Sequence, residues 1–219
     1  MSGEARADRV VHCADAMEWL RAQTVLEGCS IFTSLPDATE LPGVDQARWR
    51  AWFMEAAGLC VSRTPDAGVT LFYQSDVKRQ GTWVDKAYLV QRAVEDAGSA
   101  LLFHKIVCRF PPGTVTHGRA AYGHLLAFSK GVRVDLARAT ADVLPEQGHM
   151  TWVRAIGLSA TRAGCRFVQE HTQTRTVVDP FCGVGTVLAV ANELGLSAVG
   201  VELNRKRAQK ARSLVVAGG

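Results

Sequence analysis

The chain lacks paired cysteines, long apolar runs and a strong charge of either sign. Its six cysteines form no CxxC pair, which argues against a zinc ribbon or a disulfide framework, and we expect no metal site. No apolar run reaches the roughly 18 residues that a membrane-spanning helix needs. Lys and Arg number 25 against 21 Asp and Glu, so the net charge of +4 permits a polyanionic partner without demanding one.

The N-terminus and the length of the chain indicate a cytoplasmic protein with one domain. The N-terminal segment MSGEARADR is polar and has no apolar core behind it, unlike a secretory signal. We therefore expect a soluble, cytoplasmic protein that does not enter a membrane. A length of 219 residues suits one domain with a sizeable core, spanning residues 1–219.

Seven short apolar runs alternate with stretches of helical spacing, which predicts an α/β sheet with largely parallel strands. The apolar runs occupy residues 10–13, 29–34, 69–74, 100–107, 124–129, 176–181 and 198–203. Helical spacing marks residues 45–61, 84–98, 150–171 and 185–195. The Pro- and Gly-rich segment 109–118 is expected to be a loop between two strands.

The most specific segment runs from Thr176 to Asn204. An apolar strand ends at Asp179, a glycine-containing turn follows, and a helix begins near Thr186. Glycine is required where a ligand lies directly on the backbone, and the start of the next helix offers unpaired N–H donors. The following strand ends in Glu202, whose carboxylate can accept both hydroxyls of a ribose. This spacing indicates a nucleoside-binding loop, although an ordinary buried strand, turn and helix with incidental glycines is the alternative.

The loop DPFCGVGT lacks the third glycine of a dinucleotide-binding GxGxxG loop. It resembles the S-adenosylmethionine (SAM) motif of class I methyltransferases, in the DPFxGxGT form of amino-methyltransferases and several RNA base methyltransferases. The resemblance implies SAM as the cofactor and Glu202 as its ribose ligand. It also implies that the methionine end of SAM lies on Asp179, Phe181, Gly183, Gly185 and Thr186. Cys182 has no histidine base nearby in sequence, so we do not expect a nucleophile there.

Only one predicted strand follows this loop, so the other strands of the sheet must precede it. Residues 9–37 resemble the opening of the β-class DNA amino-methyltransferases, with a strand, Asp15-Ala16, a short helix from Met17 to Gln23, a strand and a catalytic turn. The resemblance implies a circularly permuted Rossmann-like fold with a seven-stranded, mostly parallel sheet and helices on both faces. It places Asp15 and Ala16 at the adenine ring, while a cap for the short helix is a second role for Asp15.

Residues 149–164 resemble the segment that precedes the cofactor loop in the same enzymes. There a turn and a helix close over the methionine end of SAM. By this resemblance His149, Thr151 and Trp152 lie at the start of that helix, and Thr151 and Trp152 are candidate cofactor contacts. A tryptophan at helical spacing is also typical of a core residue.

The candidate catalytic turn is Ser34-Leu35-Pro36-Asp37, and it departs from the family at two positions. Leu35 stands where proline is usual, and Asp37 stands where an aromatic ring is usual. In the family, the first side chain and the next carbonyl accept hydrogen bonds from the target amine while the ring stacks on the flipped base. Ser34 and the Leu35 carbonyl could still hold the amine. Asp37 or Glu40 could act as a general base, and Asp37 could instead cap the next segment.

Cationic and aromatic residues at the strand ends are candidates for substrate contact. Lys105 is a catalytic candidate, because a lysine inside an apolar run needs a partner, for which Asp37 or Asp76 would serve. The other strand-end residues would contact phosphates or a base, or form an ordinary solvated rim; they are Tyr73, Lys78, Arg79, Trp83, Lys86, His104 and Arg109.

The function that these patterns favour is N-methylation of a nucleic-acid base by SAM. Structured RNA, such as tRNA or rRNA, is preferred over DNA, because residues 111–148 must supply the final hairpin and leave no room for a large target-recognition insert. A small molecule or a protein side chain is an alternative acceptor. A SAM-binding partner subunit without activity is a third possibility, and a protein partner or a homodimer stays open.

Overall fold

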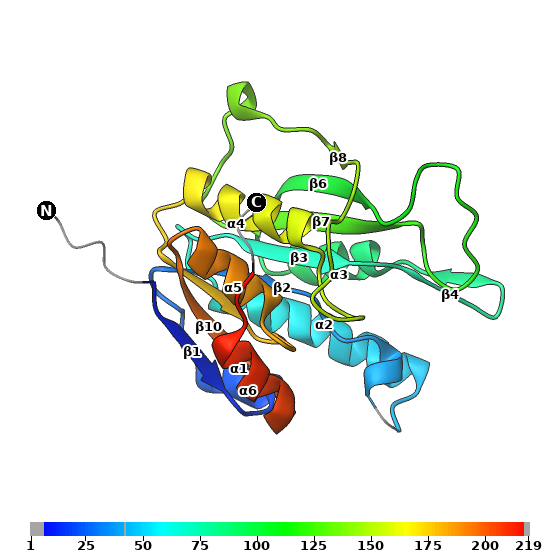
Figure 1. The fold of residues 1–219 in the computed structure, drawn as a ribbon, viewed down its shortest axis with the longest axis horizontal. Helices are drawn as coiled ribbons and strands as arrows, with labels where there is room; N and C mark the ends of the chain where they lie inside the picture. The colour runs from blue at the N-terminus through cyan, green and yellow to red at the C-terminus, as the bar shows by residue number, and fades with distance from the viewer. Residues whose placement is uncertain (1–6, 42, 217–219) are drawn as a thin grey trace, which may run out of the picture.

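A computed structural model describes residues 7–41 and 43–216. Most of the polar N-terminal segment, residues 1–6, therefore lies outside the described residues. Eight strands form the main sheet in the order β1-β10-β9-β2-β3-β7-β6-β8 (Figure 1). Their bounds are Arg9–His12 (β1), Cys29–Thr33 (β2), Thr70–Gln74 (β3), Ala100–Cys108 (β6), Tyr122–Ser129 (β7), Val143–Leu144 (β8), Thr176–Asp179 (β9) and Ser197–Val201 (β10).

All seven predicted apolar runs form strands of this sheet. Strand β7 runs antiparallel to β3 and β6, and the other neighbouring strands are parallel, so the mostly parallel prediction is confirmed. The predicted count of seven strands is wrong. The eighth strand, β8, pairs Val143 with Ile106 and Leu144 with Val107 at the sheet edge, and two residues are too few to form a recognisable apolar run.

Helices cover both faces of the sheet, as the resemblance implies. Helices α1 (Ala16–Ala22), α2 (Gln46–Arg63) and α3 (Lys86–Glu95) pack on one face, and α4 (Leu158–His171), α5 (Thr186–Glu193) and α6 (Arg205–Ser213) pack on the other. Neighbouring strand residues alternate between the two cores: Ile31 and Phe72 join the first, and Phe32 and Leu71 join the second. This alternation is the period of two that a strand imposes.

Two shorter features complete the fold. A hairpin of β4 (Val77–Arg79) and β5 (Thr82–Val84) follows β3, and the loop before β7 lies against it through Lys78, which donates to the carbonyls of Gly118 and Thr116 (Figure 1). Single-turn 3-10 helices occupy Ala38–Glu40 and Leu136–Arg138. No helix in the described part of the chain is long and apolar enough to span a membrane.

The permuted order places strands from the N-terminal and C-terminal parts of the chain side by side in the sheet. The unit β9-α5-β10, from the C-terminal part, inserts between β1 and β2, from the N-terminal part. Because β1, β10, β9, β2 and β3 are parallel, their carboxyl ends meet at one edge. The loops that carry the predicted site residues leave the sheet at this edge, where ligands of open α/β sheets bind.

Candidate functional site

A cavity of about 240 Å³ opens at the carboxyl ends of β2, β9 and β10. It collects segments that are far apart in sequence, from the start of α1 to the residues after β10. Many of the predicted site residues line it: Asp15, Ala16, Ser34, Leu35, Pro36, Trp152, Asp179, Phe181, Gly183, Thr186 and Glu202. We refer to it below as the cofactor cavity.

The glycines of the loop between β9 and α5 make the close approaches that their positions require. Gly183 and Gly185 have φ angles of 56° and 89°. A Cβ atom on Gly185 would lie 2.8 Å from the Cα atom of Ala211 in α6, and one on Gly183 would lie 3.2 Å from Trp152. Gly185 caps α5 without any side-chain hydrogen bond, so no side chain of the described residues occupies the N–H groups at the helix start. Gly185 thus serves helix packing, and Gly183 leaves room for the Trp152 ring at the cavity.

Asp179 ends β9 at the floor of the cofactor cavity. Its Oδ1 atom accepts hydrogen bonds from the Thr33 hydroxyl at 2.6 Å and from the Phe181 amide at 3.1 Å. Burial raises the pKa of Asp179 to about 7, and the nearby Glu202 carboxylate acts in the same direction. A cationic group placed here would favour the ionised form.

Glu202 has one oxygen engaged and one available. Its Oε1 atom accepts from the Asn204 amide at 2.6 Å and from Nε and Nη2 of Arg207 at 3.0 and 2.8 Å. Its Oε2 atom accepts no hydrogen bond from any residue that the structure describes. The carboxylate is therefore held in place by the protein and keeps acceptor capacity for hydroxyl groups in the cavity.

These residues fit SAM. The cavity offers a carboxylate for ribose hydroxyls, unoccupied amides at a helix start, and a second carboxylate for an ammonium group. When bound, SAM supplies an electrophilic methyl group. Asp15 lines the cavity and also caps α1, accepting from the Glu18 amide at 3.0 Å, so its two predicted positions are compatible.

The segment before α4 differs from the prediction. Residues 151–155 form bends and a turn, and α4 begins at Leu158, so the predicted helix start at His149, Thr151 and Trp152 is wrong. Gly157 caps α4, and a Cβ atom there would clash with the Gln147 carbonyl oxygen. Thr151 and Trp152 still reach the cofactor loop, because the Thr151 hydroxyl contacts that of Thr186 and the Trp152 ring covers Gly183.

Some residues of the cofactor cavity were not indicated by the sequence pattern. Trp52 of α2 makes an edge contact with Phe181 at 5.7 Å between ring centroids, but in sequence it looks like any apolar residue of an amphipathic helix. Arg207 belongs to α6, a helix that was not predicted. Cys182 is buried, and burial raises the pKa of its thiol, which agrees with a residue that fills the loop.

A second cavity, of about 190 Å³, adjoins the first. The two share Ser34, Leu35, Glu40, Arg154, Ala155 and Ile156. Neither the Ser34 hydroxyl nor the Leu35 carbonyl accepts a hydrogen bond from a described residue. The turn after β2 therefore presents two open acceptors where the cavities meet. We call this second space the acceptor cavity.

Asp37 is buried at the wall of the acceptor cavity and is surrounded by cations. Its Oδ2 atom lies 3.0 Å from Nη2 of Arg119 and 3.7 Å from Nζ of Lys86. Its Oδ1 atom accepts from the Ala38 amide and lies 3.9 Å from Arg79. Glu40 is engaged as well, with Arg154 at 2.8 Å and with the Asp37 amide. The capping alternative for Asp37 is thus realised, and the ion pairs occupy both oxygens that a general base would need.

The predicted partners of Lys105 are wrong. Its Nζ atom donates to the carbonyls of Thr140 and Ala141 at 3.0 and 2.8 Å and lies 3.6 Å from Asp142. The segment that leads into β8 thus provides the hydrogen-bond acceptors and the carboxylate for this lysine at the sheet edge. Lys105 lines neither cavity. The buried lysine beside Asp37 is Lys86. Burial lowers the pKa of Lys86, and the Asp37 carboxylate opposes this change.

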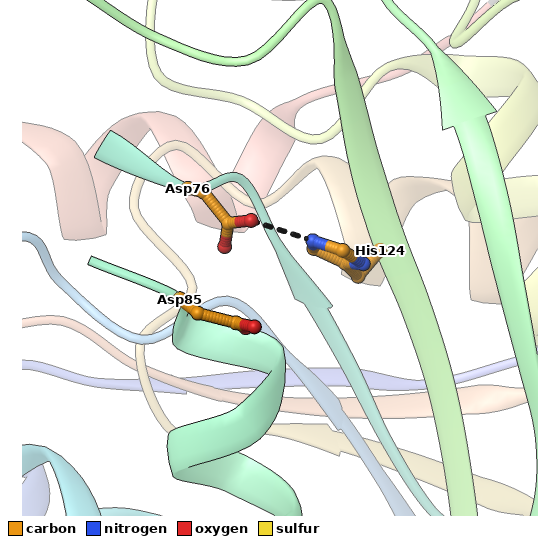
Figure 2. Close-up of side chains that lie close together, drawn as sticks. All are labelled: Asp76, Asp85 and His124. Atoms are coloured by element: carbon orange, nitrogen blue, oxygen red, sulfur yellow. Dashed lines mark hydrogen bonds and ion pairs between the residues drawn. The ribbon is translucent and has the colours of Figure 1, made fainter. Parts of the chain in front are cut away.

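A chain of hydrogen bonds holds the backbone amide of Lys86, whose side chain pairs with Asp37. Figure 2 shows Asp76, just beyond β3, facing His124 on β7, with Asp85 at the start of α3. Asp76 Oδ2 lies 2.9 Å from Nε2 of His124, and Asp76 Oδ1 accepts from the Lys86 amide at 2.9 Å. Nδ1 of His124 lies 2.8 Å from Nε2 of His104. Both ring nitrogens of His124 are thus engaged within the described residues, so we assign no metal to this cluster.

Replacing Glu202 by alanine is expected to raise the Kd of S-adenosylhomocysteine by about 30-fold, because hydrogen bonds to a charged acceptor are lost. Isothermal titration calorimetry would measure the change. Glu95→Ala, at an exposed position of α3, is the matched control and should bind like the parent. An affinity of the Glu202→Ala variant within about twofold of the parent would show that Glu202 is not the ribose ligand.

Comparisons with known proteins agree with this geometry. A family model described as DNA methylase matches residues 166–213, the segment that contains the cofactor loop. Comparison with curated protein sequences gives no match. TTHA0409 from Thermus thermophilus, a candidate DNA modification methylase, has 18% identity and a TM-score of 0.72, with 93% of this chain and 92% of that chain covered.

Two further structures bear on the cofactor and the fold. The complex of TTHA0409 with SAM has 21% identity and a TM-score of 0.69, with 93% of this chain and 92% of that chain covered. The cytosine-N4-specific PvuII DNA methyltransferase has 16% identity and a TM-score of 0.68, with 94% and 86% covered. The chain therefore has the fold of these methyltransferases, with its strands in a circularly permuted order, and its cofactor loop lies in the segment that the DNA methylase family model matches.

Proposed function

We propose that the protein transfers a methyl group from SAM to an exocyclic amino nitrogen of a base in DNA. The observation that carries this proposal is the junction of the two cavities at Ser34 and Leu35. An amine held at that turn from the acceptor cavity would lie beside the cofactor cavity. Residues 1–219 would then act as one catalytic domain.

The preference for RNA rested on the lack of a large target-recognition insert. The comparisons remove that reason, because 92% of the candidate DNA modification methylase TTHA0409 aligns with this chain without a large insert. The family model and the PvuII enzyme are also named for DNA. We therefore prefer DNA as the acceptor.

The chemistry asked of the chain is mainly positioning. The Ser34 hydroxyl and the Leu35 carbonyl would accept hydrogen bonds from the two N–H groups of the amine, which leaves the nitrogen lone pair directed at the methyl carbon. Bound SAM would supply the methyl group to this nitrogen and be released as S-adenosylhomocysteine, and the nitrogen would give up one proton to water. A flipped base is needed, because a base in the stack cannot reach the junction of the cavities.

Incubation with methyl-labelled SAM and separate pools of unmodified genomic DNA, tRNA and rRNA tests this function. We expect label in DNA, on an amino group identified by nucleoside mass spectrometry. Ser34→Ala should lower kcat about tenfold or more while S-adenosylhomocysteine binds as before, since only the amine loses a partner. Ser213→Ala, at the end of α6, is the matched control. Label confined to RNA, or to no nucleic acid, would refute the DNA proposal.

A further inference from the structure

The acceptor cavity is lined by groups that donate hydrogen bonds. Four cations line it and can only donate, and they outnumber the two carboxylates with which three of them are paired; the cations are Lys86, Arg109, Arg119 and Arg154, and the carboxylates are Asp37 and Glu40. The Lys86 side chain is only 3% exposed. An electropositive wall of this kind favours a ligand with several acceptor atoms close together.

Gln74 is a second and independent indication that the acceptor cavity binds a ligand. It ends β3 at the wall of the acceptor cavity and is 1% exposed. Its Nε2 atom is buried and has no hydrogen-bond partner among the described residues. A buried amide donor without a partner is rare in folded proteins and is costly unless a ligand completes it.

No aromatic ring of the catalytic turn can stack on a base, so hydrogen bonds must contribute more to its recognition. Asp37 takes the position of the usual ring and is held by cations. Tyr73 lines the cavity but is packed against Gly123, where a Cβ atom would lie 2.5 Å from the Tyr73 hydroxyl oxygen, and that hydroxyl bonds Gln147 at 3.2 Å. Tyr73 is 6% exposed, which leaves little of its ring face for a base.

The two bases that carry a suitable amino group differ in the atoms beside it. Cytosine presents ring N3 and then carbonyl O2, two adjacent acceptors on the edge that bears the amine. Adenine presents N1 and then a C–H group. Donors that meet O2 of cytosine would face C–H of adenine and stay unpaired. Sites that hydrogen-bond a substrate group reject analogues without it strongly.

We propose that the acceptor cavity selects cytosine, with Gln74 and Lys86 as specificity-determining residues that donate to ring N3 and carbonyl O2. This inference rests on the proposed function and names its substrate base. Arg119 stabilises the arrangement by holding Asp37, so that Lys86 keeps a counter-charge when the cavity is filled.

Nucleoside mass spectrometry of DNA methylated by the full chain is the first test. We expect N4-methylcytosine in excess of N6-methyladenine by about 100-fold or more. N6-methyladenine as the main product would overturn the inference while leaving amino-methylation of DNA intact. Absence of methylated base in every pool, with S-adenosylhomocysteine binding intact, would instead overturn the proposed function and this inference with it.

Gln74→Leu is the second test, because leucine has nearly the same volume and cannot donate. Its kcat/KM for DNA should fall about 30-fold while the Kd of S-adenosylhomocysteine stays within about twofold. Gln91→Leu, on α3 outside both cavities, is the matched control and should keep the parent's kcat/KM. An unchanged kcat/KM for a folded Gln74→Leu variant would overturn the role of Gln74. If that variant does not fold, Gln74→Met supplies the same comparison.

Discussion

Replacing Asp179 by asparagine is expected to stabilise the ligand-free protein increasingly as the pH rises, by about 3 kcal/mol more at pH 8 than at pH 5. The cause is the burial of this carboxyl group under the cofactor cavity, which raises its pKa to about 7 from an ordinary value of 3.8. Asparagine keeps an oxygen that can accept from Thr33 and from the Phe181 amide, so the hydrogen bonds of Asp179 need not be lost.

The sign follows from proton binding. In the unfolded chain Asp179 loses its proton near pH 4, whereas in the folded chain it keeps the proton up to about pH 7. Between these values the folded state binds more protons, so its stability falls as the pH rises. The asparagine variant has no such proton, and its advantage over the parent must therefore widen across the same interval.

Urea denaturation at pH 5, 6, 7 and 8 would measure the difference between the variant and the parent. His104 and His171, whose pKa values burial lowers, change the stability of both proteins equally and cancel in the difference. Asp96→Asn, at an exposed position after α3, should give a difference that does not depend on pH over this range. A pH-independent difference for Asp179→Asn would mean that Asp179 is ionised in the folded protein at pH 5.

The fold could be predicted where the sequence has a clear hydrophobic pattern or a glycine at a position that allows no side chain. The two hydrophobic cores take alternate residues of the same strands, so these strands appear in the sequence as continuous apolar runs. Helix α6 was missed because only two alanines, Ala208 and Ala211, are buried in an otherwise charged stretch. Alanine is too small to mark an apolar face, yet here it allows α6 to approach Gly185.

The cofactor cavity was easier to predict than the acceptor cavity for a physical reason. The cofactor loop is local, since strand, glycines and helix follow one another and the backbone itself makes the site. The acceptor cavity depends on which distant side chains meet, and sequence cannot decide whether Asp37 faces Lys86 or Lys105. The start of α3 and the register of β6 against β8 settle that choice.

Asp37→Asn is expected to lower the free energy of unfolding by about 3 kcal/mol, because it removes the ion-pair partner of the buried Lys86 ammonium and leaves only the weaker influence of Asp76 and Glu40. Asparagine can still cap the turn that begins at Ala38, so the loss reports the charge. Arg79 and Arg119 are 36% and 42% exposed and can be rehydrated, so they add little to the loss.

A double-mutant cycle separates this effect from general disruption. Lys86→Met alone should lower stability by about 1 kcal/mol, since Asp37 keeps Arg119 at 3.0 Å. The double variant Asp37→Asn/Lys86→Met should also lose only about 1 kcal/mol, because neither buried charge remains. Asp66→Asn, which breaks the pair between the exposed Asp66 carboxylate and Lys130, is the control and should change stability by less than about 0.5 kcal/mol. Losses that simply add in the double variant would mean that Asp37 does not neutralise Lys86. The positive charge of Lys86 would then not be balanced by Asp37 in the acceptor cavity before a substrate binds.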